Sequence, residues 1–314
     1  MKKTLLMVIT ALICLALLSA CGGGAAAPDI PLPEGAVPEA EINVYLDGAP
    51  LNEEALTYDK LIDGMSEVAV GDASYVGVSV ADIAGQDISG CAGAFLEASD
   101  GYVCWVDGTD LTLAAYAKEG EEYNFITLDD VNSFGLAAAD GSLLCGVTNI
   151  YLVTTAPDFA VDIQVNGESK ATLTLKDFMK KTPVGDGKVP TAMYDGSFKY
   201  NAGSSTYEGR FLGIDYETML AKLDNLEGVD FEGEIKEVEY YGTPGNGEPG
   251  KNTEYSTRPD DEKSFASVDF FCMYDGMTIN PDIKDIPVGL AVFVNGTGSR
   301  WLTYSLETIN IITE

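Results

Sequence analysis

The stretch YVGVSVADI, Tyr75–Ile83, returns in altered form as FLGIDYETM, Phe211–Met219. Each stretch has an aromatic residue, an aliphatic residue, a glycine and a second aliphatic residue, followed by a short polar start to an apolar helical segment. This pattern predicts a strand that leads into a helix. Its recurrence in the second half of the chain predicts that one local design is used twice.

The similarity extends to the segments on either side. INVYLDG (Ile42–Gly48) matches VDIQVNG (Val161–Gly167), and both predict a strand that ends in a hairpin turn. LTYDKLI (Leu56–Ile62) matches LTLKDFM (Leu173–Met179), and each predicts a short helix whose threonine can cap the first turn. Asp215 is the expected N-cap of the helix after the second glycine turn. Matching strands then follow in the same order, at 94–106 and 235–245, at 111–117 and 268–274, and at 147–154 and 306–313.

This shared order predicts a tandem duplication, with a first copy at residues 41–155 and a second at 160–314. Each copy is expected to be α+β, with short helices on a mixed sheet or distorted barrel-sandwich. The second copy is longer because it contains two polar inserts. The insert at 242–263 is rich in Gly, Pro and charge and is therefore expected to form a loop.

The N-terminal residues predict where the protein is located. Basic residues at the start precede an apolar run, Leu5–Leu18, that is too short for an ordinary membrane span and ends in small residues before Cys21. This arrangement resembles the bacterial lipobox. It implies a signal peptide at 1–20, a lipid on Cys21 and a flexible tether at 21–40. We therefore expect a protein anchored by lipid to the extracytoplasmic face of the cell membrane; a plain signal peptide with an unrelated cysteine is the alternative.

Composition excludes several classes of function. The chain has 50 acidic and 18 basic residues and a formal net charge of −32, so it could not neutralise the phosphates of a nucleic acid. It contains no histidine, which excludes Ser-His-Asp and Cys-His mechanisms and imidazole-ligated metals. The acidic clusters do not have the spacing of a twelve-residue calcium loop, and no metal site is predicted.

Four cysteines follow the segment that ends at Cys21, namely Cys91, Cys104, Cys145 and Cys272. A disulfide among the first three is one interpretation, because the protein is expected outside the cytoplasm. Buried free thiols in strands are the other interpretation, because a chain of this length does not need disulfides to be stable.

The order of elements resembles the molybdopterin-binding domain of sulfite-oxidase-type oxidoreductases, in the shortened form of bacterial surface lipoproteins. The resemblance is carried by the strand ending in Asn166-Gly167, by Leu173–Phe178, by the glycine turns at Gly77 and Gly213, and by Asp100-Gly101-Tyr102. It implies two tandem copies of that fold.

The resemblance also implies a molybdenum ligand that this chain lacks. The family holds the metal through a cysteine just before the aromatic–X–Gly turn, but the stretches GMSEVAVGDAS and FKYNAGSSTYEG contain no cysteine. The cofactor's phosphate needs cationic donors, and the arginines, Arg210, Arg258 and Arg300, all lie in the second copy. We therefore expect no cofactor; molybdopterin bound by the second copy without the cysteine is the alternative.

Candidate ligand-binding residues occur in both copies. Arg210 lies beside the second glycine turn, where it could form an ion pair or hold an anionic group, and Arg300 is a further candidate. Tyr240 and Tyr241 are neighbours on a strand, so one of them must face outward or into a cleft.

In the first copy, Asp100 and Tyr102 could line a ligand groove or simply end a strand. Trp105, Tyr102 and Tyr116 could form an aromatic platform for a sugar or quinone, or pack in the core.

These observations predict a non-catalytic binding or assembly module that uses its interdomain face or the second copy's pocket. The expected partner is a small molecule or a protein of the cell envelope. Two alternatives stay open: a molybdopterin-dependent oxidoreductase that uses the second copy, and a surface spacer or adhesin.

Overall fold

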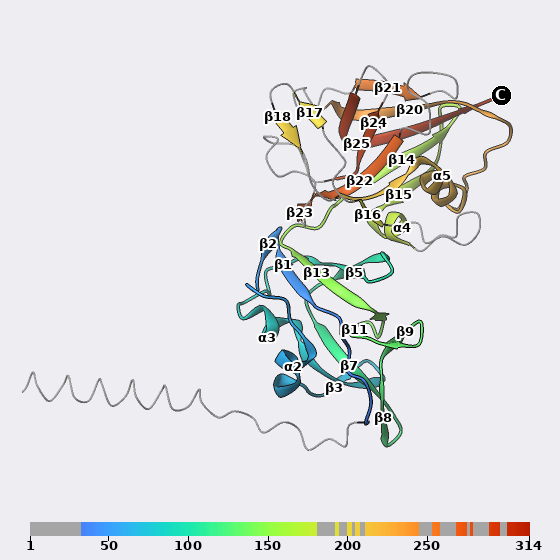
Figure 1. The fold of residues 1–314 in the computed structure, drawn as a ribbon. Coiled ribbons are helices and arrows are strands. Elements are labelled where there is room, and N and C mark those ends of the chain that lie inside the picture. The colour runs from blue at the N-terminus through green and yellow to red at the C-terminus, as the bar shows by residue number, and fades with distance from the viewer. Residues whose placement is uncertain are drawn as a thin grey trace, which may run out of the picture.

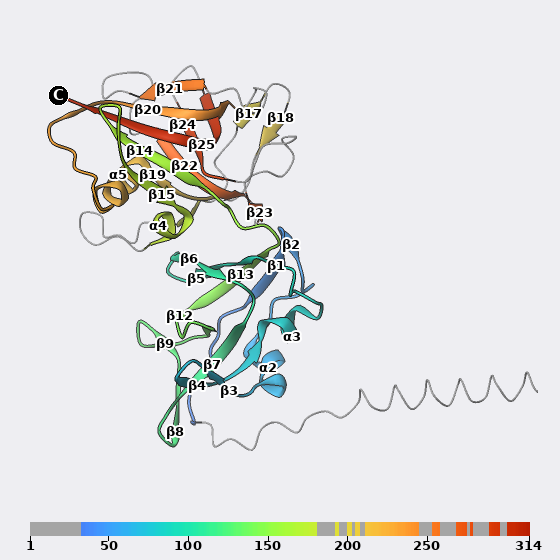
Figure 2. The same ribbon diagram turned by 180° about the vertical axis from the view of Figure 1, so that it is seen from behind.

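The computed structural model of this chain describes residues 33–180, 192–194, 200–202, 205–207, 211–244, 253–257, 268–274, 277–278, 289–295 and 300–314. Its sheets and few short helices form a mixed α+β fold, as predicted, and the described strands form no closed barrel. Figure 1 and Figure 2 show two lobes, the N-terminal half (33–155) and the C-terminal half (156–314).

The N-terminal half contains two sheets that share a core. Its strands are β1 (Asn43–Leu46), β2 (Ala49–Pro50), β3 (Ser66–Val70), β4 (Ala73–Ser79), β5 (Gly93–Ala98), β6 (Val103–Asp107), β7 (Leu111–Glu119), β8 (Glu122–Phe125), β9 (Thr127–Leu128), β10 (Val131–Asn132), β11 (Gly135–Ala138), β12 (Leu143–Cys145) and β13 (Val147–Val153). One sheet has the order β2-β1-β13-β5-β6, and the other has the order β12-β11-β7-β4-β3 with β8 beside β7, while β9 and β10 form a separate two-stranded sheet. The helices are α2 (Tyr58–Leu61), a 3-10 turn (Ile62–Gly64) and α3 (Val80–Ala84).

The C-terminal half is built around one ten-stranded sheet. Its strands are β14 (Ala160–Val165), β15 (Glu168–Thr174), β16 (Ala192–Tyr194), β19 (Phe211–Asp215), β20 (Ile235–Pro244), β21 (Thr253–Thr257), β22 (Val268–Tyr274), β23 (Met277–Thr278), β24 (Ala291–Asn295) and β25 (Arg300–Thr313). A separate hairpin contains β17 (Tyr200–Ala202) and β18 (Ser205–Tyr207), and the helices are α4 (Leu175–Met179) and α5 (Tyr216–Asp224).

Strand pairing follows the same scheme in both halves. The first strand of each half is parallel to its last strand, β1 to β13 and β14 to β25. Each last strand is antiparallel to an internal strand, β5 or β20, and that strand pairs with β6 or β21. In each half the strand of the glycine motif is paired to one more strand, β4 to β7 and β19 to β22, which in turn pairs with β11 or β24.

The glycine of the repeated motif has a specific structural role. In both halves the register shifts at this residue, between Val76 and Gly77 in one and between Leu212 and Gly213 in the other. A Cβ on Gly77 would lie 2.4 Å from the carbonyl oxygen of Leu113. Glycine is therefore required because the backbone of β7 comes too close to this bulge for any side chain.

The first hairpin of each half is tied to the end of its last strand. Asp47 and Asn166 both have positive φ angles, 45° and 51°, as a type I′ turn requires. The backbone N–H of Thr154 donates to Asp47 Oδ1 at 2.9 Å, and that of Thr313 donates to Asn166 Oδ1 at 3.0 Å. The matched Asp-Gly and Asn-Gly turns of the sequence thus hold equivalent positions.

Helix capping differs between the two threonines that the sequence predicts to be caps. Thr174 forms a capping box with Asp177, and Asp215 accepts from the backbone N–H of Thr218 at 2.8 Å, both as predicted. Thr57 makes no side-chain cap, so that prediction is wrong. The residue three positions after Thr57 is Lys60, so α2 also lacks the reciprocal bond that Asp177 gives α4.

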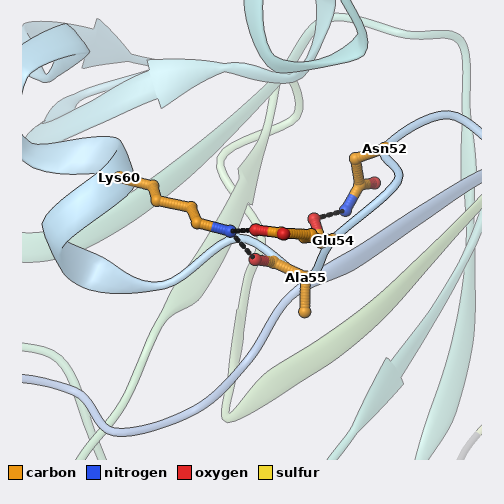
Figure 3. Close-up of polar contacts among 4 residues, drawn as sticks. All are labelled: Asn52, Glu54, Ala55 and Lys60. Carbon is orange, nitrogen blue, oxygen red and sulfur yellow. Dashed lines mark hydrogen bonds and ion pairs between the residues drawn. The ribbon is translucent and has the colours of Figure 1, made fainter.

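Lys60 instead ties α2 to the loop that precedes it (Figure 3). Its Nζ donates to Glu54 Oε2 at 2.8 Å and to the carbonyl oxygen of Ala55 at 3.0 Å. The amide of Asn52 holds the same loop by donating to the carbonyl oxygen of Glu54 at 2.7 Å. Because this ion pair is exposed, it positions the loop but contributes little stability.

The prediction of a loop at 242–263 is wrong in part. The strand β20 continues to Pro244, and β21, with the sequence TEYST, pairs with it. Threonine and tyrosine favour strands, and this local preference exceeds the effect of the surrounding glycines and prolines.

The two halves meet through a shared apolar cluster. Phe95 on β5 and Tyr151 on β13 belong to the same buried cluster as Phe178 and Met179 on α4. The neighbouring side chains on these strands, such as Leu96, face the core of the N-terminal half. The sheet containing β5 is therefore covered on both faces, and α4 lies against its β5–β6 end (Figure 1 and Figure 2).

Candidate functional site

A cleft of about 760 Å³ lies where the two halves meet. Three parts of the chain form it: β6 with the neighbouring part of β5, the β11–β12 hairpin, and α4 of the other half. Its lining residues are Leu96, Tyr102, Cys104, Trp105, Val106, Asp107, Leu136, Ala138, Ala139, Asp140, Ser142, Leu143, Leu144, Lys176, Asp177, Met179 and Lys180.

The cleft runs along the open edge of β6. Four consecutive residues of this strand, Cys104 to Asp107, all line it. Successive side chains of a strand point to opposite faces of the sheet, so residues of both faces can line one cavity only where it passes along the strand's edge. Among the described strands, β6 is the last of its sheet and its ladder partner is β5.

Two hairpin turns of the same design stand at the cleft, ASDGY (98–102) and AADGS (138–142). In each, the first alanine N–H donates to the carbonyl oxygen of the fifth residue, and the glycine N–H donates back to the first alanine. Asp100 and Asp140 each accept at 2.9 Å from the backbone N–H two residues later. The glycines have φ angles of 84° and 85°, which favour glycine. Both aspartates therefore hold turns.

One ion pair joins the α4 wall to β6, and a hydrogen bond within β6 orients its carboxylate. Trp105 Nε1 donates to Asp107 Oδ1 at 2.7 Å, and Lys176 Nζ lies 3.3 Å from Asp107 Oδ2. These contacts, with the hydrogen bond from Trp105 first, hold the pKa of the Asp107 carboxyl below its usual range. Asp177 is occupied by the capping box of Thr174.

Lys222, a buried lysine on α5, contacts the end of α4 within the C-terminal half. The side chain of Lys222 on α5 is 2% exposed, and its Nζ donates to the carbonyl oxygen of Lys180 at 2.6 Å. Burial lowers the pKa of this amine to about 8. The contact satisfies a carbonyl at the end of α4, where Lys180 and Met179 line the cleft.

The four thiols of the described chain are protonated at neutral pH, because burial raises the pKa of each. Cys91, Cys104, Cys145 and Cys272 are all free, which answers the question of a disulfide that the sequence left open. Burial, and then the charge of Asp140, raises the pKa of Cys104 to about 12. A thiol in that state is a poor nucleophile.

The aromatic residues of the first copy divide between cleft and core. Tyr102 and Trp105 line the cleft. Tyr116 packs in the core at 2% exposure, where its hydroxyl lies 2.5 Å from that of Tyr58. Asp100 is exposed in its turn and does not belong to the lining.

The tyrosine pair of the second copy points to opposite faces, as its strand requires. Tyr240 is fully buried and packs edge-on against Phe270, so it serves the core and not a ligand. Tyr241 is half-buried and donates to Glu239 at 3.0 Å, and the same carboxylate accepts from Asn310 at 2.6 Å. Neither tyrosine lines the cleft.

Three predicted positions have no described side chain. Cys21 and Arg210 lie outside the described residues, and Arg300 begins β25 but its side chain is not described. Within the part of the chain that the structure covers, no cluster of three or more Cys, Asp or Glu could hold a metal, and no helix is long and apolar enough to cross a membrane.

Sequence reasoning missed the residues that α4 and the second turn contribute to the cleft, among them Lys176, Met179 and Ser142. One signal was present, because the pattern Ala-X-Asp-Gly occurs at 98–101 and again at 138–141. The contribution of α4 could not be seen, because it arises only when the two halves meet.

We find no match to this chain among protein-family models, curated proteins or solved structures. The functional assignment is therefore argued from the cleft itself.

Proposed function

We propose that the protein is a non-catalytic binding module, anchored by lipid through Cys21 on the outer face of the cell membrane, and that the cleft between its halves is the binding site. Its two halves are, on this proposal, degenerate copies of a sulfite-oxidase-type domain. The shared strand pairing and the paired bulges at Gly77 and Gly213 support the duplication.

The cleft is the observation that carries the proposal. Its volume of about 760 Å³ is within the range of ligand sites, roughly 300–1,000 Å³. The floor is apolar, with Leu96, Leu136 and Leu144, and aromatic and charged groups stand around it. Such a combination supplies apolar contact together with polar groups that orient a ligand.

The chemical state of its groups favours binding over catalysis. Cys104 is held as a thiol, and Asp107 accepts from Trp105 and pairs with Lys176. Asp177 is committed to the helix cap, and the low-pKa amine of Lys222 donates to a backbone carbonyl. Each of these groups is thus protonated or already engaged.

The alternative function, that of a molybdopterin enzyme, is tested by measuring the molybdenum and pterin content of the protein. The mature protein is purified from a host that makes the cofactor, and molybdenum and pterin are measured by mass spectrometry. We expect neither above the level of a protein without such a site. Stoichiometric molybdenum and pterin would overturn the non-catalytic assignment.

The binding site is tested with a panel of small-molecule fragments and a displayed library of random peptides. The chain has two tryptophans, so a Trp301→Phe protein leaves Trp105 as a fluorescent reporter within the cleft. Ala139→Phe fills the cleft from an exposed position, whereas Val131→Phe adds the same side chain at an exposed site outside the lining. We expect ligands that change Trp105 fluorescence, bind the Val131→Phe protein and fail to bind the Ala139→Phe protein. If no fragment or peptide behaves in this way, the cleft is not a binding site.

A further inference from the structure

We propose that the ligand of this cleft is an extended peptide segment of another protein, with net positive charge, which adds to β6 as a new edge strand. This inference rests on the proposed function, because it names the class of ligand that the same site takes. Strand addition is a general mode of peptide recognition at open sheet edges.

Two residues of β6 have backbone groups that face away from its partner strand β5. In the β5–β6 ladder, the N–H of Ala98 donates to the carbonyl oxygen of Tyr102, and that of Gly108 donates to Ala92. Hydrogen-bonded pairs alternate along an antiparallel ladder, so Cys104 and Val106 also face β5. The N–H and C=O groups of Trp105 and Asp107 therefore point away from β5, toward the open edge that the cleft follows.

The cleft has the two sides that an added strand needs. Side chains of such a strand would alternate between the apolar floor, formed by Leu96, Leu136 and Leu144, and the α4 wall. Leu143, one of the exposed large apolar residues of the described chain, stands at the rim. A segment matching the four residues of β6 that line the cleft, Cys104–Asp107, would be about 13 Å long, at roughly 3.3 Å per residue.

Charge selects the kind of segment. The chain carries a net charge of −32, which repels acidic peptides and attracts basic ones over a long range. Within the cleft, Asp107, Asp140 and Asp177 outnumber Lys176 and Lys180. The alternating apolar residues of such a segment would contact the apolar floor, and its net positive charge would complement the acidic chain and cleft.

The displayed library provides the first test. Peptides selected on the full chain should carry net positive charge and alternating apolar residues. The tightest one should bind at least about tenfold more weakly when its alternate backbone amides are N-methylated, because strand addition uses those N–H groups. Methylation of the set that faces β6 should weaken binding, whereas methylation of the other set should not. A selected peptide that keeps its affinity in both methylated forms would overturn the inference.

Two substitutions at one position test the protein's own edge. Asp107→Ala removes the carboxylate and keeps the outward N–H, whereas Asp107→Pro removes the N–H as well and leaves the bonds to β5 in place. We expect Asp107→Pro to weaken peptide binding by at least about tenfold relative to Asp107→Ala, as a lost donor and a clashing ring would do. Equal binding by the two folded variants would contradict strand addition.

Hydrogen exchange of the unaltered chain keeps the test independent of those variants. Peptide binding should slow exchange at the amides of Trp105 and Asp107 and leave Cys104 and Val106, which already pair with β5, little changed. Fragments that bind the cleft while no peptide does so would overturn this inference and leave the proposed function standing. Absence of both kinds of ligand would overturn the two together.

Discussion

At the corner between its sheets the N-terminal half is open, whereas the C-terminal half closes the same corner with a longer strand. β20 has ten residues and pairs with β25 as far as Pro244 opposite Thr303. β5 ends at Ala98 opposite Val147, and the chain then turns back into β6. The two halves therefore share a pairing scheme but differ in their sheets. The scheme gives one continuous sheet in the C-terminal half and two large sheets in the N-terminal half.

The corner itself is built alike in both halves, which makes the difference informative. Gly146 and Ser305 both have positive φ angles, 74° and 46°, just before the last strand enters its parallel pairing. The next residue in each half donates to an equivalent carbonyl, Val147 to Phe134 and Leu306 to Leu290. The two halves thus share the corner and differ in the strand that passes through it. β25 continues through the corner as one strand of 14 residues, whereas β12 and β13 are separate strands, and β12 lines the cleft with β6.

The largest expected effect concerns the glycine bulge that the two halves share. Gly77→Ala should lower the free energy of unfolding by about 3 kcal/mol, because its Cβ would overlap the backbone of β7. Gly213→Ala should have a similar effect if the bulges are equivalent. Gly90→Ala is the control, because nothing lies within 4 Å of a Cβ there. Urea denaturation measures all three, and a neutral Gly77→Ala would contradict the role given to the bulge.

The second effect concerns Lys222, the buried lysine of α5. The corresponding helix of the N-terminal half, the shorter α3, contains no lysine. Lys222→Met should stabilise the protein by about 2 kcal/mol at pH 7, because a pKa lowered from 10.5 to about 8 corresponds to about 3 kcal/mol, offset by one lost hydrogen bond of about 1 kcal/mol.

The pH dependence of this variant provides its own control. The folded protein binds this proton more weakly than the unfolded chain, so the unaltered protein gains stability relative to Lys222→Met as pH rises from about 8 to about 10.5. Urea denaturation of both proteins at pH 7 and pH 10 measures the change. A difference that stays constant with pH would show that Lys222 is not buried with a lowered pKa.

A smaller effect compares the two cap positions. Thr174→Ala should cost about 1 kcal/mol, because it removes the capping box of α4. Thr57→Ala should cost less than about 0.5 kcal/mol, because Thr57 makes no side-chain cap. Thermal unfolding of the two variants, measured side by side, checks this ratio. Equal losses would mean that the difference between the caps has no energetic consequence.

The smallest effect concerns the ion pair that joins the halves across the cleft. Lys176→Met should change the free energy of unfolding by no more than about 0.5 kcal/mol, because Lys176 and Asp107 are both largely exposed. A loss above 1 kcal/mol in urea denaturation would show that this pair, and not the apolar cluster around Phe178, holds the halves together.

Local features of the fold could be predicted from the sequence. The glycine turns, the Asp-Gly and Asn-Gly hairpins and the caps at Thr174 and Asp215 depend on neighbouring residues, and short stretches contain that information. The sequence around Thr57 allows a cap that the structure does not use, and the strand β21 was hidden among glycines and prolines.

The site was less predictable because it depends on contacts between distant segments. Tyr102 and Trp105 were among the aromatic candidates and both line the cleft, but nothing in the sequence places Lys176 and Met179 beside them. Tyr240 had the pattern expected of a binding residue and is buried in the core, since periodicity cannot tell which face of a strand is covered. Lys222 lies within an apolar helical pattern and is buried with it.

The most direct test of the account is ligand binding by the matched pair Ala139→Phe and Val131→Phe, read from the fluorescence of Trp105. The account predicts that ligands bind the Val131→Phe protein as they bind the unaltered chain and that filling the cleft with Ala139→Phe abolishes binding. Equal binding by both variants would show that the open corner of the N-terminal half is not the binding site.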